Sequence, residues 1–334
     1  MVQTLLVVGG NGFLGSTVCR TAVKRGWKVT SISSSGRPFQ TPKGHSPAWV
    51  SQVDWRAASA FEPHMYKDLL AGSSAVVHCI GTLFEDTSYK QAVQSGNLSR
   101  LFNAMTSQAN PLRSGTSESS YQRLNYESAM TVLDTYLKVS SSVPTQRAFV
   151  YISAEDIFGP LVPRGYINSK RAAERDIALS CLNSPEAGVQ PISLRPGLMY
   201  HPHLRPLTTP IATVLSASAQ AHKFLGSNSL PLPTPAGFLN TLASVISFQR
   251  PQTGHGDAPL LETLRSSANA LQIPPMHVDH VGLAACLAIE DAVSAAPPSD
   301  TDNSYHTILG VSEMRDMIGW SWDEGSRTSD HSYS

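Results

Sequence analysis

A glycine-rich turn near the N-terminus restricts what this chain can fold into more than any other feature. Gly9, Gly12 and Gly15 follow the apolar run 5–8, which predicts a short buried strand, and precede the helix-forming segment 16–26. Glycines allow a tight turn and let the backbone approach a pyrophosphate, while the helix N-terminus presents free N–H groups to the phosphates. In this strand–turn–helix context the spacing predicts a dinucleotide site rather than a plain glycine-rich turn.

The next segment indicates which dinucleotide is preferred. A second strand is expected over 27–33, and a site that prefers NAD usually places Asp or Glu near the end of that strand. Serines, including Ser33, and Arg37 occupy that place here. A guanidinium with nearby hydroxyls suits a 2′-phosphate, so NADP(H) is the preferred cofactor and NAD(H) the alternative. The other interpretation is that Arg37 simply faces solvent.

The charge of the chain is low and unevenly distributed. Its 334 residues are 41% hydrophobic and 15% charged with a net charge of +0, which indicates a globular protein and gives no sign of a nucleic-acid partner. The first acidic residue is Asp54, whereas six basic residues precede it. This bias favours an anionic ligand near the N-terminal unit, although Arg20, Lys24 and Arg25 fit a solvated helix face equally well.

Cysteines and histidines predict neither a disulfide framework nor a metal centre. The four cysteines are far apart and form no CxxC pair, so reduced, mostly buried thiols are expected. His201 with His203, and His277 with His280, are interpreted as loop or structural histidines, and no metal site is predicted. His78 lies inside an expected strand and is interpreted as a packed structural histidine.

The N-terminal half continues to alternate strands and helices. A third strand is expected over 49–55, a helix over 61–72 and a buried strand over 75–81. Ligands of parallel sheets lie beyond the carboxyl ends of the strands, so Gly81 and Thr82 are expected to border the cofactor.

A second informative stretch carries the candidate catalytic residues. An expected helix places Tyr166 and Lys170 four residues apart on one face, after a strand that ends at Ser153. A buried ammonium beside a phenol lowers the pKa of the tyrosine, which makes Tyr166 a candidate general acid or base. Ser153 is a candidate for orienting a carbonyl group, and Lys170 for pairing with Glu174 as well.

These elements predict a Rossmann-type, doubly wound α/β fold with helices on both faces of a parallel sheet and a smaller C-terminal cap. Other helices are expected over 121–139, 208–225, 237–248 and 282–289, and other strands over 148–153 and 191–197. The expected regions are the nucleotide-binding domain 1–200 with a polar insert at 86–120, a substrate or cap region 201–275, returning elements 276–324 and a frayed tail 325–334.

No transmembrane helix or cleavable leader is expected. The charge-free stretch 224–249 is interrupted by prolines and glycines, and the chain enters its first strand by residue 4. Segment 237–246 is interpreted as a core helix, with docking on a membrane or partner as the alternative.

Together these motifs resemble the extended or atypical branch of the short-chain dehydrogenase/reductase superfamily. The matching stretches are the turn 9–15, the strand 75–81, Ser153, Tyr166 with Lys170, 194–197 and 278–281. The resemblance implies that Tyr166 is the acid or base, that Lys170 holds the nicotinamide ribose and that Ser153 orients the substrate. The residues expected to bind the cofactor are Gly9, Gly12, Phe13, Leu14, Gly15, Ser33, Arg37, Gly81, Thr82, Lys170 and Pro196.

Within that branch, stretches 32–38, 77–83, 151–155 and 195–200 are similar to fungal mitochondrial dehydrogenase-like proteins of coenzyme Q biosynthesis. Those proteins are related to the NAD(P)H-binding accessory subunit of respiratory complex I. The similarity implies a matrix-side location, association with the coenzyme Q biosynthetic complex at the inner membrane, and a quinone-type ligand. This chain departs from the family at Ala58 and Ser59, where Gly-Asp is common, and at Ser34, where Arg is frequent. Both departures weaken cofactor contacts.

Three functions are consistent with these features. The first is an NAD(P)(H)-dependent oxidoreductase that acts on a quinone-type intermediate. The second is a non-catalytic, nucleotide-binding assembly or regulatory subunit, which the departures favour. The third is a sugar-nucleotide epimerase or dehydratase, which the cap disfavours because it is poor in groups that would hold a second diphosphate.

Overall fold

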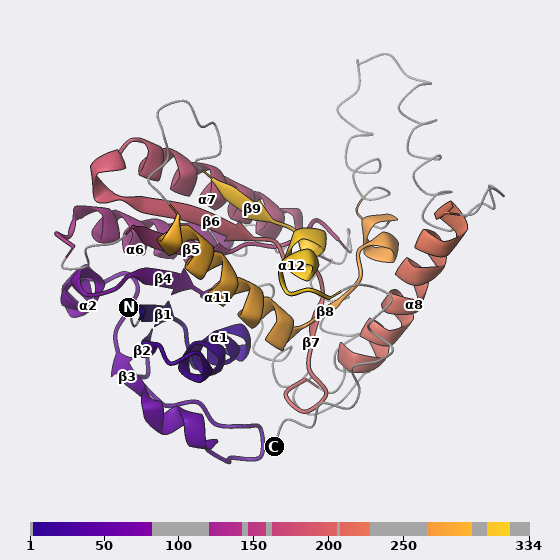
Figure 1. Ribbon diagram of the computed structural model, residues 1–334, viewed down its shortest axis with the longest axis horizontal. Helices are drawn as coiled ribbons and strands as arrows, with labels where there is room; N and C mark the ends of the chain where they lie inside the picture. The colour runs from indigo at the N-terminus through magenta and orange to yellow at the C-terminus, as the bar shows by residue number, and fades with distance from the viewer. Residues whose placement is uncertain are drawn as a thin grey trace.

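A parallel sheet of seven strands forms the centre of the protein (Figure 1). The computed structural model describes residues 3–81, 120–141, 146–157, 162–205, 208–227, 266, 268–295 and 306–320. Several predictions lie outside the described residues: Thr82, the helix expected over 237–248 and the tail 325–334. The insert at 86–120 also lies outside them, except for its last residue.

The strand order is β3-β2-β1-β4-β5-β6-β9, and each strand is parallel to its neighbours. This is the Rossmann order with β9 added at one edge, which confirms the predicted doubly wound α/β fold. The strands are β1 (Thr4–Val8), β2 (Lys28–Ser33), β3 (Val53–Ala57), β4 (Ala75–His78), β5 (Arg147–Ile152), β6 (Val189–Leu194) and β9 (Thr307–Leu309).

Helices cover both faces of the sheet (Figure 1). Because the central strands are apolar on both sides, alternate residues enter two separate cores: Leu5 and Val7 one core, Leu6 and Val8 the other. The first core includes side chains of α1 (Phe13–Lys24), α11 (Val278–Ser294) and α12 (Val311–Met317). The second includes side chains of α2 (Lys67–Ala71), α6 (Ser128–Lys138) and α7 (Arg164–Leu182).

Several predicted elements differ in extent from the observed ones, and two of the differences have an identifiable cause. The first half of the strand expected over 49–55 is the 3₁₀ helix η1 (Ala48–Gln52), where the Trp55 indole N–H donates to the Val50 carbonyl at 2.9 Å. The helix expected over 61–72 is broken into η2 (Pro63–Met65) and α2. Tyr66 interrupts it, since its buried hydroxyl donates to the Ala60 carbonyl and its backbone leaves the helical region at φ −139°.

The C-terminal helix α11 packs directly against α1 (Figure 1). A Cβ at Gly282 would lie 2.7 Å from Thr17 Cγ2, so the two helices approach closely because this position lacks a side chain. Arg20 pairs with Asp279, and Arg25 with Glu290. Acids 259 and 265 positions along the chain therefore neutralise Arg20 and Arg25, whereas Lys24 is exposed.

A second, small sheet consists of two strands. β7 (Met199–Tyr200) is parallel to β8 (Met276–His277), which leads straight into α11. The helix α8 (Thr208–Ser227) matches the helix expected over 208–225, and its Ser218 hydroxyl donates to the Leu271 carbonyl at 3.2 Å. Among the described helices, none combines the length and hydropathy that crossing a bilayer requires.

Candidate functional site

The glycine turn has the geometry that its spacing predicts. Gly9 has a φ of +87°, which favours glycine, and a Cβ at Gly15 would lie 2.2 Å from the Gly9 carbonyl oxygen. Gly12 is the exposed N-cap of α1 and offers no capping side chain, while Ser16 N–H already donates to the Gly12 carbonyl at 2.9 Å. The N–H groups of residues 13–15 therefore have no acceptor within the helix and remain available to an anion.

The loop after β2 lies where the adenosine ribose of a dinucleotide would be held. Gly36 has a φ of +61°, its N–H donates to the Ser33 carbonyl, and a Cβ there would lie 2.6 Å from Ala57 N. The loop is thus fixed against the end of β3, and Ala58 N–H also donates to the Ser33 carbonyl at 2.9 Å. Arg37 at its tip is exposed. Ser33 and Arg37 are consistent with the predicted 2′-phosphate contact.

The predicted catalytic residues come together at the carboxyl end of β5. Ser153 directly follows the strand and is buried, and its hydroxyl has no partner of hydrogen-bonding geometry within the described chain. Lys170 is buried on α7, and its ammonium donates to the Ile152 carbonyl at 2.7 Å. The Lys170 nitrogen lies 5.9 Å from the centre of the partly buried Tyr166 ring. One face of α7 therefore carries both residues, as the spacing predicts.

Asn125 also belongs to this cluster, and the sequence analysis did not single it out. Its side-chain amide donates to the Ser169 hydroxyl at 3.1 Å, and its backbone carbonyl accepts from the buried Tyr151 hydroxyl at 2.6 Å. A Cβ at Gly81 would lie 2.9 Å from the Lys170 nitrogen and 3.1 Å from Asn125 Oδ1. Asn125 lies in η4 (Gln122–Glu127), a π-helical stretch, and such stretches are frequent at functional sites. No sequence pattern indicated that irregularity.

The expected pair between Lys170 and Glu174 is replaced by stronger partners. Glu174 accepts hydrogen bonds from both Nε and Nη2 of Arg195, with Nε 2.9 Å from Oε1, and one from Arg171 at 2.7 Å. Burial raises the pKa of Glu174, but the hydrogen bonds from Arg195, the nearby Ser153 hydroxyl and the positive charges of Arg171 and Arg195 outweigh it and lower the pKa overall. Arginine forks match a carboxylate better than an ammonium does, so Lys170 donates to the backbone instead.

Burial tunes the titration of two groups in the cluster. It lowers the pKa of Lys170 to about 7, against the opposing effects of Cys79 and Glu174. It also lowers the pKa of His78 to about 3, with the nearby Lys170 charge as a second cause. His78 is completely buried and its Nε2 lies 3.0 Å from the Ser128 hydroxyl, as a packed structural histidine would be.

Pro196 lies at the end of β6, beside the segment that carries Ser153. Its carbonyl accepts from Glu155 N–H at 3.0 Å, and the Ser153 N–H donates to the Leu194 carbonyl at 2.7 Å. Pro196 therefore borders the cluster through the backbone and is itself buried.

The two histidine pairs meet, which the sequence analysis did not predict. His201 and His277 lie on the paired strands or directly after them, with ring centres 4.8 Å apart, and ligand atoms of both and of Asp279 lie within 4.8 Å of one another. Nδ1 of each ring accepts a backbone N–H, from His203 and Leu204 in one case and from Asp279 in the other. The neutral rings therefore carry their proton on Nε2, which favours hydrogen bonding over metal ligation.

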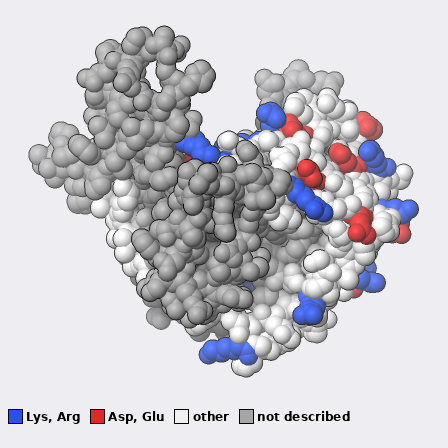
Figure 2. All heavy atoms as spheres, turned by 180° about the vertical axis from the view of Figure 1, so that it is seen from behind, with Lys and Arg blue, Asp and Glu red and all other residues white. Residues whose placement is uncertain are grey.

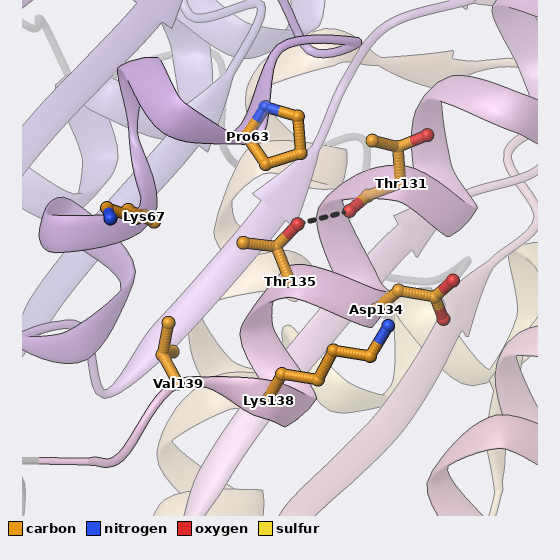
Figure 3. A pocket seen from close by; sticks show the side chains of 7 residues that line it. All are labelled: Pro63, Lys67, Thr131, Asp134, Thr135, Lys138 and Val139. Carbon is orange, nitrogen blue, oxygen red and sulfur yellow. Dashed lines mark hydrogen bonds between the residues drawn. The ribbon is translucent and has the colours of Figure 1, made fainter.

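A surface hollow of about 490 Å³ lies elsewhere on the protein (Figure 3). It is lined by Pro63, Lys67, Thr131, Asp134, Thr135, Lys138 and Val139. It contacts the C-terminal end of α6, whereas Asn125 precedes the N-terminal end of that helix. The hollow is thus at the edge of the fold away from the glycine turn.

On the described part of the face in Figure 2, acidic and basic side chains are interspersed rather than gathered by sign.

Comparison with known proteins agrees with this architecture. The family described as the NAD dependent epimerase/dehydratase family matches residues 5–230. A yeast relative (Saccharomyces cerevisiae), named MIOREX complex component 2, is 36% identical over 245 residues, which cover 70% of this chain and 86% of the relative. An uncharacterized chloroplastic protein of Arabidopsis thaliana is 29% identical over 200 residues, 59% of this chain and 51% of that protein.

Two of the solved structures that resemble this chain cover more than nine tenths of it. A short-chain dehydrogenase/reductase from Burkholderia xenovorans covers 92% of this chain, and 96% of its own, with a TM-score of 0.51 and 11% identity. An oxidoreductase of the same family from Burkholderia thailandensis covers 93% and 91%, with a TM-score of 0.50 and 13% identity. At such low identity these structures support the fold alone. The chain belongs to the NAD dependent epimerase/dehydratase family, within the short-chain dehydrogenase/reductase superfamily that its motifs predict.

Proposed function

We propose that the protein binds a nicotinamide dinucleotide, NADP(H) in preference to NAD(H), and acts as an oxidoreductase on an apolar, quinone-type molecule in mitochondrial coenzyme Q biosynthesis. One observation carries this proposal: the glycine turn and the catalytic cluster are joined through the end of β4. A Cβ at Gly9 would lie 3.5 Å from the Cys79 carbonyl carbon, and one at Gly81 would lie 2.9 Å from the Lys170 nitrogen. A dinucleotide that crosses the end of β4 would therefore reach both regions.

Each residue of the cluster would have a separate role in the reaction. The bound dinucleotide would supply or accept a hydride. The Tyr166 hydroxyl would give or take a proton at the substrate oxygen, and the buried Ser153 hydroxyl would orient that oxygen. Lys170 is held by the Ile152 carbonyl and would contact the nicotinamide ribose through its remaining N–H groups.

The Tyr166→Phe variant tests the proposed acid–base role. Removing the hydroxyl should lower turnover of a quinone-type substrate with NADPH by about 10²- to 10⁴-fold, because a positioned proton donor contributes about that much. The dissociation constant of NADPH should stay unchanged. Tyr126→Phe is the matched control, since that hydroxyl donates to Asp176 outside the cluster. Full turnover in Tyr166→Phe would refute the assignment.

The second candidate function is a nucleotide-binding subunit without turnover. The yeast relative is named as a component of a complex, which favours this alternative. The sequence resemblance is the basis for proposing a location in mitochondria, with the coenzyme Q complex at the inner membrane. Such a subunit would bind NADPH and turn over none of the quinone intermediates. If Gly12→Val neither weakens NADPH binding nor lowers stability, both candidate functions lose their common basis.

A further inference from the structure

We infer that Asn269, on the segment that precedes β8, is a positioning residue for the Ser153 hydroxyl. This inference rests on the proposed function, in which Ser153 orients the reacting oxygen of the substrate. The Ser153 hydroxyl is buried and has no partner of hydrogen-bonding geometry in the described part of the chain. The place of this hydroxyl therefore depends on the backbone that carries it.

The backbone that follows β5 is held on one side by the end of β6. Ser153 N–H donates to the Leu194 carbonyl at 2.7 Å, and Glu155 N–H donates to the Pro196 carbonyl at 3.0 Å. These bonds continue the pattern of the parallel pair for two more residues. The pattern ends at Ile157, whose N–H donates back to the Glu155 carbonyl at 3.1 Å. Residues 153–157 belong to no helix or strand, so contacts from elsewhere must fix their other side.

Those contacts come from residues 110 and 113 positions further along the chain. The Asn269 side-chain amide donates to the backbone carbonyl of Asp156 at 3.1 Å. The Ser266 hydroxyl donates to Oδ1 of Asp156 at 3.0 Å. Asp156, three residues beyond Ser153, is thus bound through both its main chain and its side chain.

Asn269 is itself well supported. Its backbone carbonyl accepts from Ile273 N–H at 2.7 Å. A Cβ at Gly197 would lie 3.4 Å from Ile273 Cγ2 and 3.6 Å from Ile157 Cδ1, so aliphatic side chains of the two segments pack around the same point. A displacement of about 1 Å at a reacting group can lower a rate by about 100-fold. The bond from Asn269 therefore matters to the reaction although Asn269 lies on a different segment from Ser153.

Asn269→Ala, made in the full chain, tests the inference. Without the amide donor the segment after Ser153 can shift, so kcat for a quinone-type substrate with NADPH should fall about tenfold or more. KM and the dissociation constant of NADPH should not change. Ser218→Ala is the matched control, because it removes a side-chain hydrogen bond to the same segment, at the Leu271 carbonyl, without involving Asp156. The control should keep the turnover of the wild type.

A Ser153→Ala background distinguishes positioning from a general loss of structure. If Asn269 acts through the Ser153 hydroxyl, Asn269→Ala should lower turnover no further in a chain that already carries Ser153→Ala. An equal fall in both backgrounds, or full turnover in Asn269→Ala alone, would overturn the inference. Melting curves of each variant show that it is folded.

Hydrogen–deuterium exchange gives a second readout that needs no turnover. The amides of Glu155 and Ile157 should exchange faster in Asn269→Ala than in the wild type, while the amides of β6 should exchange at the same rate. Unchanged exchange at Glu155 and Ile157 would show that Asn269 does not hold this segment. If the wild type turns over no quinone-type substrate, the proposed oxidoreductase function fails, and exchange at these amides still decides whether Asn269 positions the Ser153 segment.

Discussion

The glycine turn and the cluster around Lys170 form two regions of one site but are built in different ways. The turn is made by neighbours in the sequence, and a Cβ at Gly15 would collide with the Gly9 carbonyl six residues earlier. The cluster draws Gly81, Asn125, Ser153 and Lys170 from four separate segments. The turn is therefore fixed by backbone sterics, whereas the cluster depends on buried charges and their partners.

Glu174→Gln should break the cluster most strongly. The glutamine keeps the shape but leaves Arg195 and Arg171 without their counter-charge, so the free energy of unfolding should fall by about 3 kcal/mol. The pKa of Glu174 is lower in the folded protein than in the unfolded chain. The stabilisation is therefore fully present above the pKa that Glu174 has in the unfolded chain, and it is lost as the pH falls through the pKa of the folded state.

Urea denaturation at neutral pH measures the effect of Glu174→Gln. Arg175→Gln, on the same helix, is the matched control, since that arginine is exposed and should leave the midpoint unchanged. Equal midpoints for Glu174→Gln and the wild type would show that the ion pairs contribute no stability.

Gly15→Ala should break the turn and spare the cluster. Its Cβ would lie 2.2 Å from the Gly9 carbonyl oxygen, so the turn must shift, at a cost of about 1–3 kcal/mol. NADPH affinity should fall at least about tenfold because the phosphate-facing N–H groups move. Gly72→Ala is the control, since a Cβ there meets nothing within 4 Å. Unchanged affinity in Gly15→Ala would place the nucleotide elsewhere.

Arg37→Met tests which dinucleotide the loop after β2 prefers. The exposed guanidinium is the predicted partner of the 2′-phosphate, so the dissociation constant of NADPH should rise about tenfold while that of NADH stays the same. Fluorescence titration with both dinucleotides checks this. Equal changes for the two, or none, would remove the basis for a preference for NADP(H).

The last prediction concerns the pH dependence of stability. The pKa of His78 is lowered to about 3, so the unfolded chain binds a proton below about pH 6.5 that the folded protein does not. Stability should therefore fall as the pH drops from about 6.5 toward 4. His78→Gln can keep the bond to Ser128 without titrating, and its decline should be shallower. Parallel denaturation curves for the two proteins across this range would contradict the prediction.

Local sequence predicted more of the turn than of the cluster. The strand, the three glycines and the helix are contiguous, so their spacing was enough, and the four-residue interval placed Tyr166 and Lys170 on one face. Partners across the fold were not predictable in that way. Asn125 lies on a π-helical stretch that no periodicity reveals, and the acids that neutralise Arg20 and Arg25 are more than 250 residues away.

The contact between His201 and His277 also depends on segments that are far apart in the sequence. It depends on the pairing of β7 with β8, two-residue strands too short to carry a periodic signal. The break in the helix near Tyr66 was likewise set by a buried hydroxyl and not by propensity. Tertiary partners therefore decided what local patterns left undetermined.

Hydrogen–deuterium exchange of the full chain, with and without saturating NADPH, tests most directly whether the two regions form one site. Exchange of backbone amides should slow at residues 9–16 and, in the same experiment, around Gly81 and Ser153. Exchange of the amides that line the hollow between α2 and α6 should not change. Protection of the turn without the cluster would separate nucleotide binding from the proposed chemistry. Protection at neither region would contradict the account as a whole.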